Sequence, residues 1–103
     1  TWVGDGPQRE ELIARARELQ LHDQLTLTGP LSESEVGTQL DNSDLFLLPT
    51  LGDNFCIVVA EALSHGRPVV SGADTGAVDY SAPSVSRFVV DSKNPVAYAD
   101  AIF

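Results

Sequence analysis

The pattern of apolar and polar residues predicts five strands separated by helices. Short apolar runs bounded by Gly, Pro, Asn or Asp are expected to be strands, and they fall at residues 1–3, 24–29, 44–50, 68–72 and 87–90. The run at 44–50 is apolar nearly throughout, so we expect it to be buried on both faces of a sheet. Because strands and helices alternate, the expected fold is α/β, a parallel Rossmann-like sheet with helices on both faces.

Helical spacing of apolar residues predicts the intervening helices, at residues 8–20, 31–43 and 54–65 and from residue 95 onward. Local signals mark several of their ends. Ser32 is expected to cap the second helix, with Glu35 at the capping-box position. Gly66 is expected to end the third helix, and Asn94 to cap the last one with Pro95 at its first position.

The composition limits the classes of protein to consider. The chain has 103 residues, enough for one small domain over 1–103, and no apolar run approaches the ~20 residues that span a bilayer. Fifteen acidic against six basic residues give a formal charge of −9, which disfavours a nucleic-acid groove. The single cysteine, Cys56, excludes an internal disulfide framework and a Cys-rich metal site, and it fits a reducing, cytoplasmic location. Because the chain opens on Thr1 with a strand, we expect it to be a piece of a longer protein.

The turn Gly4-Asp5-Gly6-Pro7 follows the first strand, and Pro7 is expected to open the first helix. Two glycines between a strand and a helix also occur in phosphate-binding loops. The third glycine of the dinucleotide fingerprint is absent, since position 9 is Arg. A tight strand-to-helix turn is therefore the favoured interpretation.

Glu61 lies within an otherwise apolar helix at 54–65, whose N-terminus is expected at the ligand-binding edge of the sheet. That N-terminus predicts a phosphate or diphosphate site, although Asp53 or Asn54 could serve only as N-cap. A buried unpaired carboxylate is costly. Glu61 therefore faces water, pairs with Arg67, or binds a ligand diol such as a ribose. Eight helical residues span ~12 Å, too far for Asp53 and Glu61 to act on one glycosidic bond.

Several segments in order resemble one family. The segments "VGDGPQREELIARARELQLHDQLTLTGPLSESEV", "DLFLLPT", "DNFCIVVAEALSHGRPVVSG" and "PVAYADAI" are similar to the C-terminal domain of retaining nucleotide-sugar glycosyltransferases with two Rossmann domains, the GT-B type. This resemblance implies a domain that binds a nucleoside diphosphate sugar as substrate, without a metal or other cofactor. It also implies an N-terminal acceptor-binding domain outside this chain, and an acceptor at a membrane surface is one option.

The family signature is a Glu, seven residues and a second Glu. By position, the resemblance implies that Asp53 contacts the donor sugar and that Glu61 holds the ribose diol. The implied remaining donor contacts are Pro49, Thr50, Asn54, Phe55, Cys56 and Ile57. Asp53 is one methylene shorter than the usual Glu, and Cys56 stands where Gly is frequent. No residue is predicted to be a catalytic base or nucleophile.

The resemblance also implies that one strand, which would lie between those beginning at Trp2 and Leu45, is missing from this chain. Those two strands are then expected to pair directly or to leave open edges, which favour a homodimer. The predicted function is the donor-binding part of a retaining glycosyltransferase of hexosyl type, with the fragment alone inactive. A nucleotide-sugar epimerase of the same fold and a non-catalytic binding or assembly module remain alternatives.

Overall fold

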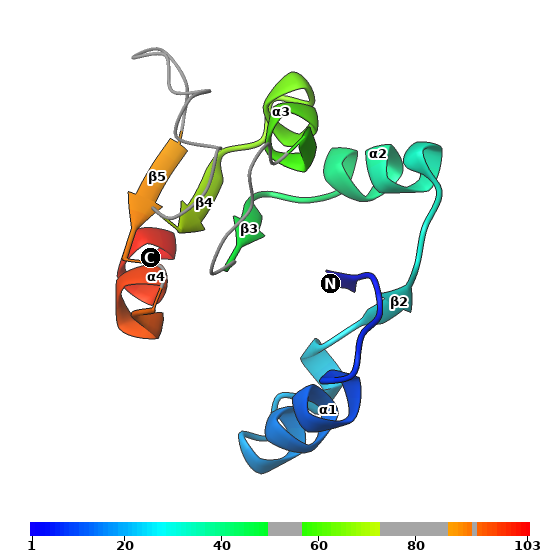
Figure 1. The fold of residues 1–103 in the computed structure, drawn as a ribbon, viewed down its shortest axis with the longest axis vertical. Helices are drawn as coiled ribbons and strands as arrows, with labels where there is room; N and C mark the ends of the chain where they lie inside the picture. Colours follow the sequence, from blue (N-terminus) through cyan, green and yellow to red (C-terminus); the bar gives the residue numbers. More distant parts are fainter. Residues whose placement is uncertain (50–56, 73–86, 92) are drawn as a thin grey trace. The chain divides into compact units, whose positions relative to one another are not determined.

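The computed structural model describes residues 1–49, 57–72, 87–91 and 93–103. Within these ranges, five strands and four α-helices follow one another in the predicted order, with an additional 3-10 turn, η1, at His22–Gln24 (Figure 1). The chain divides into two compact units, Thr1–Val36 and Gly37–Phe103. The boundary falls within the second helix, α2 (Glu33–Asp41).

The first unit contains a pair of parallel strands and one complete helix. Its elements are β1 (Trp2–Val3), α1 (Arg9–Glu18), η1 and β2 (Leu27–Gly29). Trp2 lies opposite Leu27 in the parallel pair, and α1 buries Ala16. Pro7 was expected to open the helix but lies in the turn before it, where the backbone N–H of Arg9 donates to the Gly6 carbonyl over 3.2 Å.

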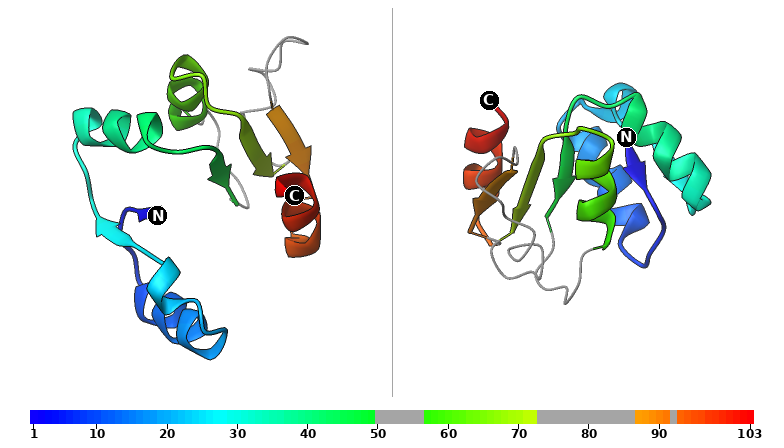
Figure 2. Two further views of the ribbon diagram at one scale, coloured as in Figure 1. Left: turned by 180° about the vertical axis from the view of Figure 1, so that it is seen from behind. Right: turned by 90° about the horizontal axis from the view of Figure 1, so that it is seen from above.

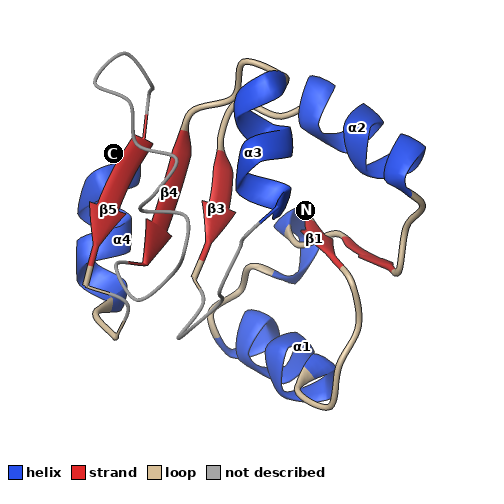
Figure 3. Ribbon diagram, turned by 45° about the horizontal axis from the view of Figure 1, so that its top comes forward, coloured by secondary structure: helices blue, strands red, loops and turns tan. Residues whose placement is uncertain are grey.

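The second unit contains a three-stranded parallel sheet. Its strands and helices after α2 are β3 (Phe46–Leu48), α3 (Ile57–Ser64), β4 (Val69–Gly72), β5 (Arg87–Val90) and α4 (Pro95–Ile102). The strands lie side by side in the order β3-β4-β5 (Figure 3). Helix α3 contacts β3 and β4, helix α4 contacts β4 and β5, and the two helices cover opposite faces of this sheet (Figures 1 and 2).

The core of the second unit is centred on β4. All four residues of β4 are buried, and Val69, Val70 and Ser71 are fully enclosed, as is Val59 of α3. The prediction that residues 44–50 are buried on both faces is wrong, because Leu47 of β3 is 40% exposed. Among the described strands, β4 has a hydrogen-bonded neighbour on each side, whereas β3 pairs with β4 alone.

Within the described residues, the strands pair as β1-β2 in the first unit and as β3-β4-β5 in the second. Each of the two units therefore has its own set of parallel strand pairs. Direct pairing of the strands that begin at Trp2 and Leu45 would join the two units, so the choice between pairing and open edges stays a prediction. The expected homodimer through open strand edges likewise stays a prediction.

Local hydrogen bonds confirm the predicted helix ends. Asn94 Oδ1 accepts from the backbone N–H groups of Val96 and Ala97 over 3.1 and 3.2 Å, which caps α4 as expected. Gly66 follows α3 in the left-handed conformation, with φ of 71°. The Gly66 N–H donates to the Leu63 carbonyl and the Arg67 N–H to the Ala62 carbonyl, which is the Schellman arrangement.

Ser32 and Glu35 form the predicted capping box at the start of α2. The Ser32 backbone N–H donates to Glu35 Oε2 over 2.8 Å, and the Glu35 N–H donates to Ser32 Oγ over 3.3 Å. Hydrogen bonding to the Glu35 carboxylate, from the Ser32 backbone N–H first and from the Ser32 side chain second, holds the pKa of Glu35 below its ordinary value of 4.5.

We expect the depressed pKa of Glu35 to make part of the stability pH-dependent. The unfolded chain binds the proton more tightly, so this contribution is complete well above pH 4.5 and is lost as the pH falls through the lower, folded pKa. An NMR titration should place the Glu35 midpoint below 4.5, and Ser32→Ala should move it upward. A midpoint at or above 4.5 in the unaltered protein would contradict the assignment.

Candidate functional site

The carboxyl ends of β3, β4 and β5 meet at one edge of the sheet because the strands are parallel. Of the eight candidate donor-binding residues, five lie outside the described residues: Thr50, Asp53, Asn54, Phe55 and Cys56. The structure places the other three. Pro49 is exposed directly after β3, Ile57 is the first residue of α3 in the described range, and Glu61 lies four residues further along α3.

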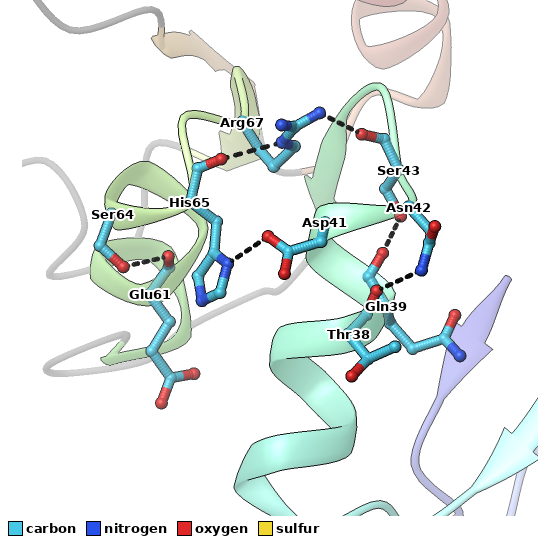
Figure 4. Close-up of polar contacts among 9 residues, drawn as sticks. All are labelled: Thr38, Gln39, Asp41, Asn42, Ser43, Glu61, Ser64, His65 and Arg67. Atoms are coloured by element: carbon cyan, nitrogen blue, oxygen red, sulfur yellow. Dashed lines mark hydrogen bonds and ion pairs between the residues drawn. The ribbon is translucent and has the colours of Figure 1, made fainter.

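Glu61 lies on the open side of α3. Ile57, one turn before it, is 68% exposed, whereas Val59 and Ala62 are fully buried against the sheet. The sequence predicts a helix that is apolar on all sides apart from Glu61, but the fold fully buries only the side that carries Val59 and Ala62. Glu61 is partly exposed, and within the described residues its carboxylate makes no hydrogen bond or ion pair (Figure 4).

Arg67 does not pair with Glu61, so that alternative is wrong. The Arg67 guanidinium donates through Nη1 to the Ser43 carbonyl over 2.7 Å and through Nε to the His65 carbonyl over 3.0 Å. Figure 4 shows the guanidinium bridging these carbonyls while the Glu61 carboxylate extends away from the network. The positive charge of Arg67 therefore contacts carbonyl oxygens within the second unit and not the Glu61 carboxylate.

His65 has a partner that sequence analysis did not find. Its Nδ1 lies 2.7 Å from Oδ1 of Asp41, the last residue of α2 (Figure 4). The sequence placed His65 at a helix end, which the structure confirms, since α3 ends at Ser64. The two residues are 24 positions apart, and no local spacing rule connects them. The sequence signal was limited to His65, a polar residue at the expected end of the helix at 54–65.

The Gly4–Gly6 turn behaves as a structural turn. The Gly4 N–H donates to the Gly29 carbonyl over 2.9 Å, and the Gly6 N–H donates to Asp5 Oδ1 over 2.8 Å. Both glycine amides are therefore occupied rather than pointed at a phosphate. Gly4 has φ of 110°, a conformation that favours glycine. These contacts support the tight turn over the phosphate loop.

A cavity of about 420 Å³ lies beside this turn within the first unit. Its apolar wall includes Trp2 and Leu27, and its charged lining residues are Asp5, Glu11, Arg9 and Arg15. Two acids and two bases cancel, and both arginines already pair with glutamates, Arg9 with Glu10 and Arg15 with Glu18. The cavity therefore offers no excess of positive charge to a diphosphate.

Two kinds of feature are absent from the part of the chain that the structure describes. No group of three or more His, Cys, Asp or Glu side chains there could hold a metal ion. None of the described helices combines the length and the apolar character needed to cross a membrane.

Comparison with known protein families and structures shows the family of this chain. The family model described as glycosyl transferases group 1 matches residues 1–103. The chain belongs to this family. The predicted resemblance to GT-B glycosyltransferases is thereby confirmed, and with it the α/β fold class.

Curated relatives of this group 1 chain carry glycosyltransferase names. It is 30% identical over 97% of its length to a 2-deoxystreptamine N-acetyl-D-glucosaminyltransferase of Niallia circulans, of which it spans 26%. It is 32% identical over 92% of its length to a D-inositol 3-phosphate glycosyltransferase of Mycolicibacterium smegmatis, of which it spans 22%. It is 31% identical over 97% of its length to a GDP-mannose-dependent alpha-(1-6)-phosphatidylinositol monomannoside mannosyltransferase of Mycobacterium tuberculosis, of which it spans 28%.

A solved structure supports the group 1 fold. The sucrose-phosphate synthase of Thermosynechococcus elongatus superposes with a TM-score of 0.85 over 97% of this chain and 27% of that one. The sequence identity is 24%, so this likeness concerns the fold alone. The chain thus matches about a quarter of a larger protein in both comparisons.

Proposed function

We propose that this chain is the donor-binding part of a retaining glycosyltransferase. The reaction moves a sugar, of hexosyl type, from a nucleoside diphosphate sugar to an acceptor hydroxyl. The observation that carries the proposal is the Glu61 carboxylate, which is partly exposed on the open side of α3 and has no partner among the described residues. A carboxylate of this kind can accept hydrogen bonds from two adjacent ribose hydroxyls.

The remaining donor contacts are assigned by position in the family pattern. We assign Asp53 to the donor sugar, the start of α3 to the diphosphate, and Pro49 and Thr50 to the floor of the site. Backbone N–H groups at a helix N-terminus, together with the helix dipole, stabilise negative charge on a departing diphosphate. The proposed reaction therefore needs no metal ion and no cofactor besides the nucleotide sugar. An N-terminal acceptor domain, a cytoplasmic location and an acceptor at a membrane surface belong to the same proposal.

The chain by itself should bind a nucleoside diphosphate sugar weakly or not detectably. Its formal charge is −9, and Arg9, Arg15 and Arg67 are already engaged within the fold. Isothermal titration calorimetry on the chain, beside the full-length protein as control, measures this directly. A dissociation constant in the low micromolar range for the chain alone would contradict the expectation.

The proposed function is tested on the full-length protein with a panel of nucleotide sugars and acceptors. We expect transfer from one donor class, and NMR of the product should show the donor's anomeric configuration retained. Inversion of the configuration would overturn the retaining mechanism. Isomerisation of the donor without an acceptor would indicate the epimerase alternative. Absence of both donor binding and turnover would favour the non-catalytic module.

A further inference from the structure

The C-terminal end of α3 is attached to the end of α2 by the Asp41–His65 pair. His65 directly follows α3, and its Nδ1 lies 2.7 Å from Asp41 Oδ1. An ionised carboxylate only accepts hydrogen bonds, so Nδ1 must carry the proton. This contact fixes the tautomer and the orientation of the imidazole ring.

Arg67 adds a second link between the same two segments. One guanidinium nitrogen donates to the Ser43 carbonyl, just after α2, and another donates to the His65 carbonyl, just after α3. Ser43 is itself held to α2, since its hydroxyl donates to the Gln39 carbonyl over 2.6 Å. The end of α3 is therefore held to the α2–β3 segment through both a side chain and the backbone (Figure 4).

Gly37 provides the surface against which the His65 ring lies. A Cβ atom at Gly37 would come within 3.4 Å of His65 Cε1 and 3.6 Å of Nε2. These are ordinary van der Waals distances, so a methyl group fits but a longer side chain would meet the ring. The imidazole is thus bounded by the α2 backbone as well as hydrogen-bonded to Asp41.

Glu61 is connected directly to this attachment. The His65 backbone N–H donates to the Glu61 carbonyl over 3.1 Å, and Ser64 Oγ donates to the same oxygen over 2.7 Å. Glu61 and His65 are four residues apart, which is about one helical turn. A rotation of the α3 end about its axis would therefore move the Glu61 side chain with it.

We propose that Asp41 and His65 are positioning residues that set the orientation of α3 and thereby aim Glu61 at the ribose of the donor. The inference rests on the proposed role of Glu61. Asp41 and His65 themselves do not touch the donor in this proposal. Among the described residues, their hydrogen bond joins the side chains at the two helix ends directly, and it acts beside the Arg67 link.

The test uses the full-length protein and compares variants that lose the Asp41–His65 hydrogen bond with variants that keep it. Asp41→Ala and His65→Ala should each raise the donor KM about tenfold with kcat changed less than twofold, because binding and not chemistry is affected. Asp41→Asn keeps an acceptor and His65→Asn keeps a donor near the Nδ1 position, so both should restore a KM close to the unaltered value. Asn42→Ala is the control, because it removes a bond to the Thr38 carbonyl within α2 only.

A second substitution shows whether the pair acts through Glu61. In a Glu61→Gln background, Asp41→Ala should cause no further rise in the donor KM.

If the alanine variants do not fold, Gly37→Leu provides another test. It displaces the His65 ring while keeping both partners, and it should raise the donor KM similarly. If Glu61→Gln raises KM but the Asp41 and His65 variants do not, the positioning role is overturned and the proposed function stands. A fall in Tm and kcat of the Asp41 and His65 variants without a change in donor KM would mean that the pair has a structural role only. An unchanged donor KM in Glu61→Gln would contradict both the positioning role and the proposed ribose contact.

Discussion

Replacing Glu61 with Gln in the full-length protein should raise the donor KM roughly tenfold to hundredfold and leave kcat nearly unchanged. Gln keeps the shape of the side chain but removes the charge and one acceptor oxygen. A hydrogen bond to a charged group contributes about 1.5–3 kcal/mol, and a ribose contact that does not change during the reaction lowers binding rather than turnover. Steady-state kinetics over a range of donor concentrations measure the effect.

The matched control for this prediction is Glu33→Gln. Glu33 is an exposed glutamate in the first turn of α2, outside the proposed site. We expect its donor KM and kcat to match those of the unaltered protein. If Glu61→Gln behaves like Glu33→Gln, the ribose role is wrong and the exposed carboxylate serves only to solvate α3.

Val59→Asp should abolish the native fold of the second unit. Val59 is fully buried where α3 packs on β3 and β4, and no described side chain there offers a positive charge. An unpaired carboxyl group in such a place costs about 4 kcal/mol or more, against a total of about 5–15 kcal/mol for a typical domain. Denaturant unfolding and the yield of soluble protein report the loss.

The same substitution at an exposed valine provides the control. Val96 in the first turn of α4 is 64% exposed, so Val96→Asp should change the free energy of unfolding by less than about 0.5 kcal/mol. Val59→Ala gives a graded effect of about 2 kcal/mol, because it removes two buried methyl groups. Equal stability of the two Asp variants would mean that α3 does not pack on β3 and β4 through Val59.

Much of the local structure could be predicted because it depends on neighbours within five residues. The Ser32–Glu35 capping box and the Asn94 cap follow from spacing and appear as expected. The start of α1 at Arg9 rather than at residue 8 is a small boundary error. For the site, the sequence selected Glu61, and the structure adds that it lies on the exposed side of its helix.

The sequence by itself determined the order of strands and helices, their caps and the family, since these follow from periodicity and from motifs in a fixed order. Only the tertiary structure decided which strands are interior. Leu47 is exposed and Val70 is buried, although both lie in equally apolar runs, because among the described strands β3 pairs with one neighbour and β4 with two. It also decided that Asp41 meets His65 and that Arg67 binds carbonyls rather than Glu61. Contacts between residues 24 positions apart depend on how α2, β3 and α3 fold back on one another, which no local spacing specifies.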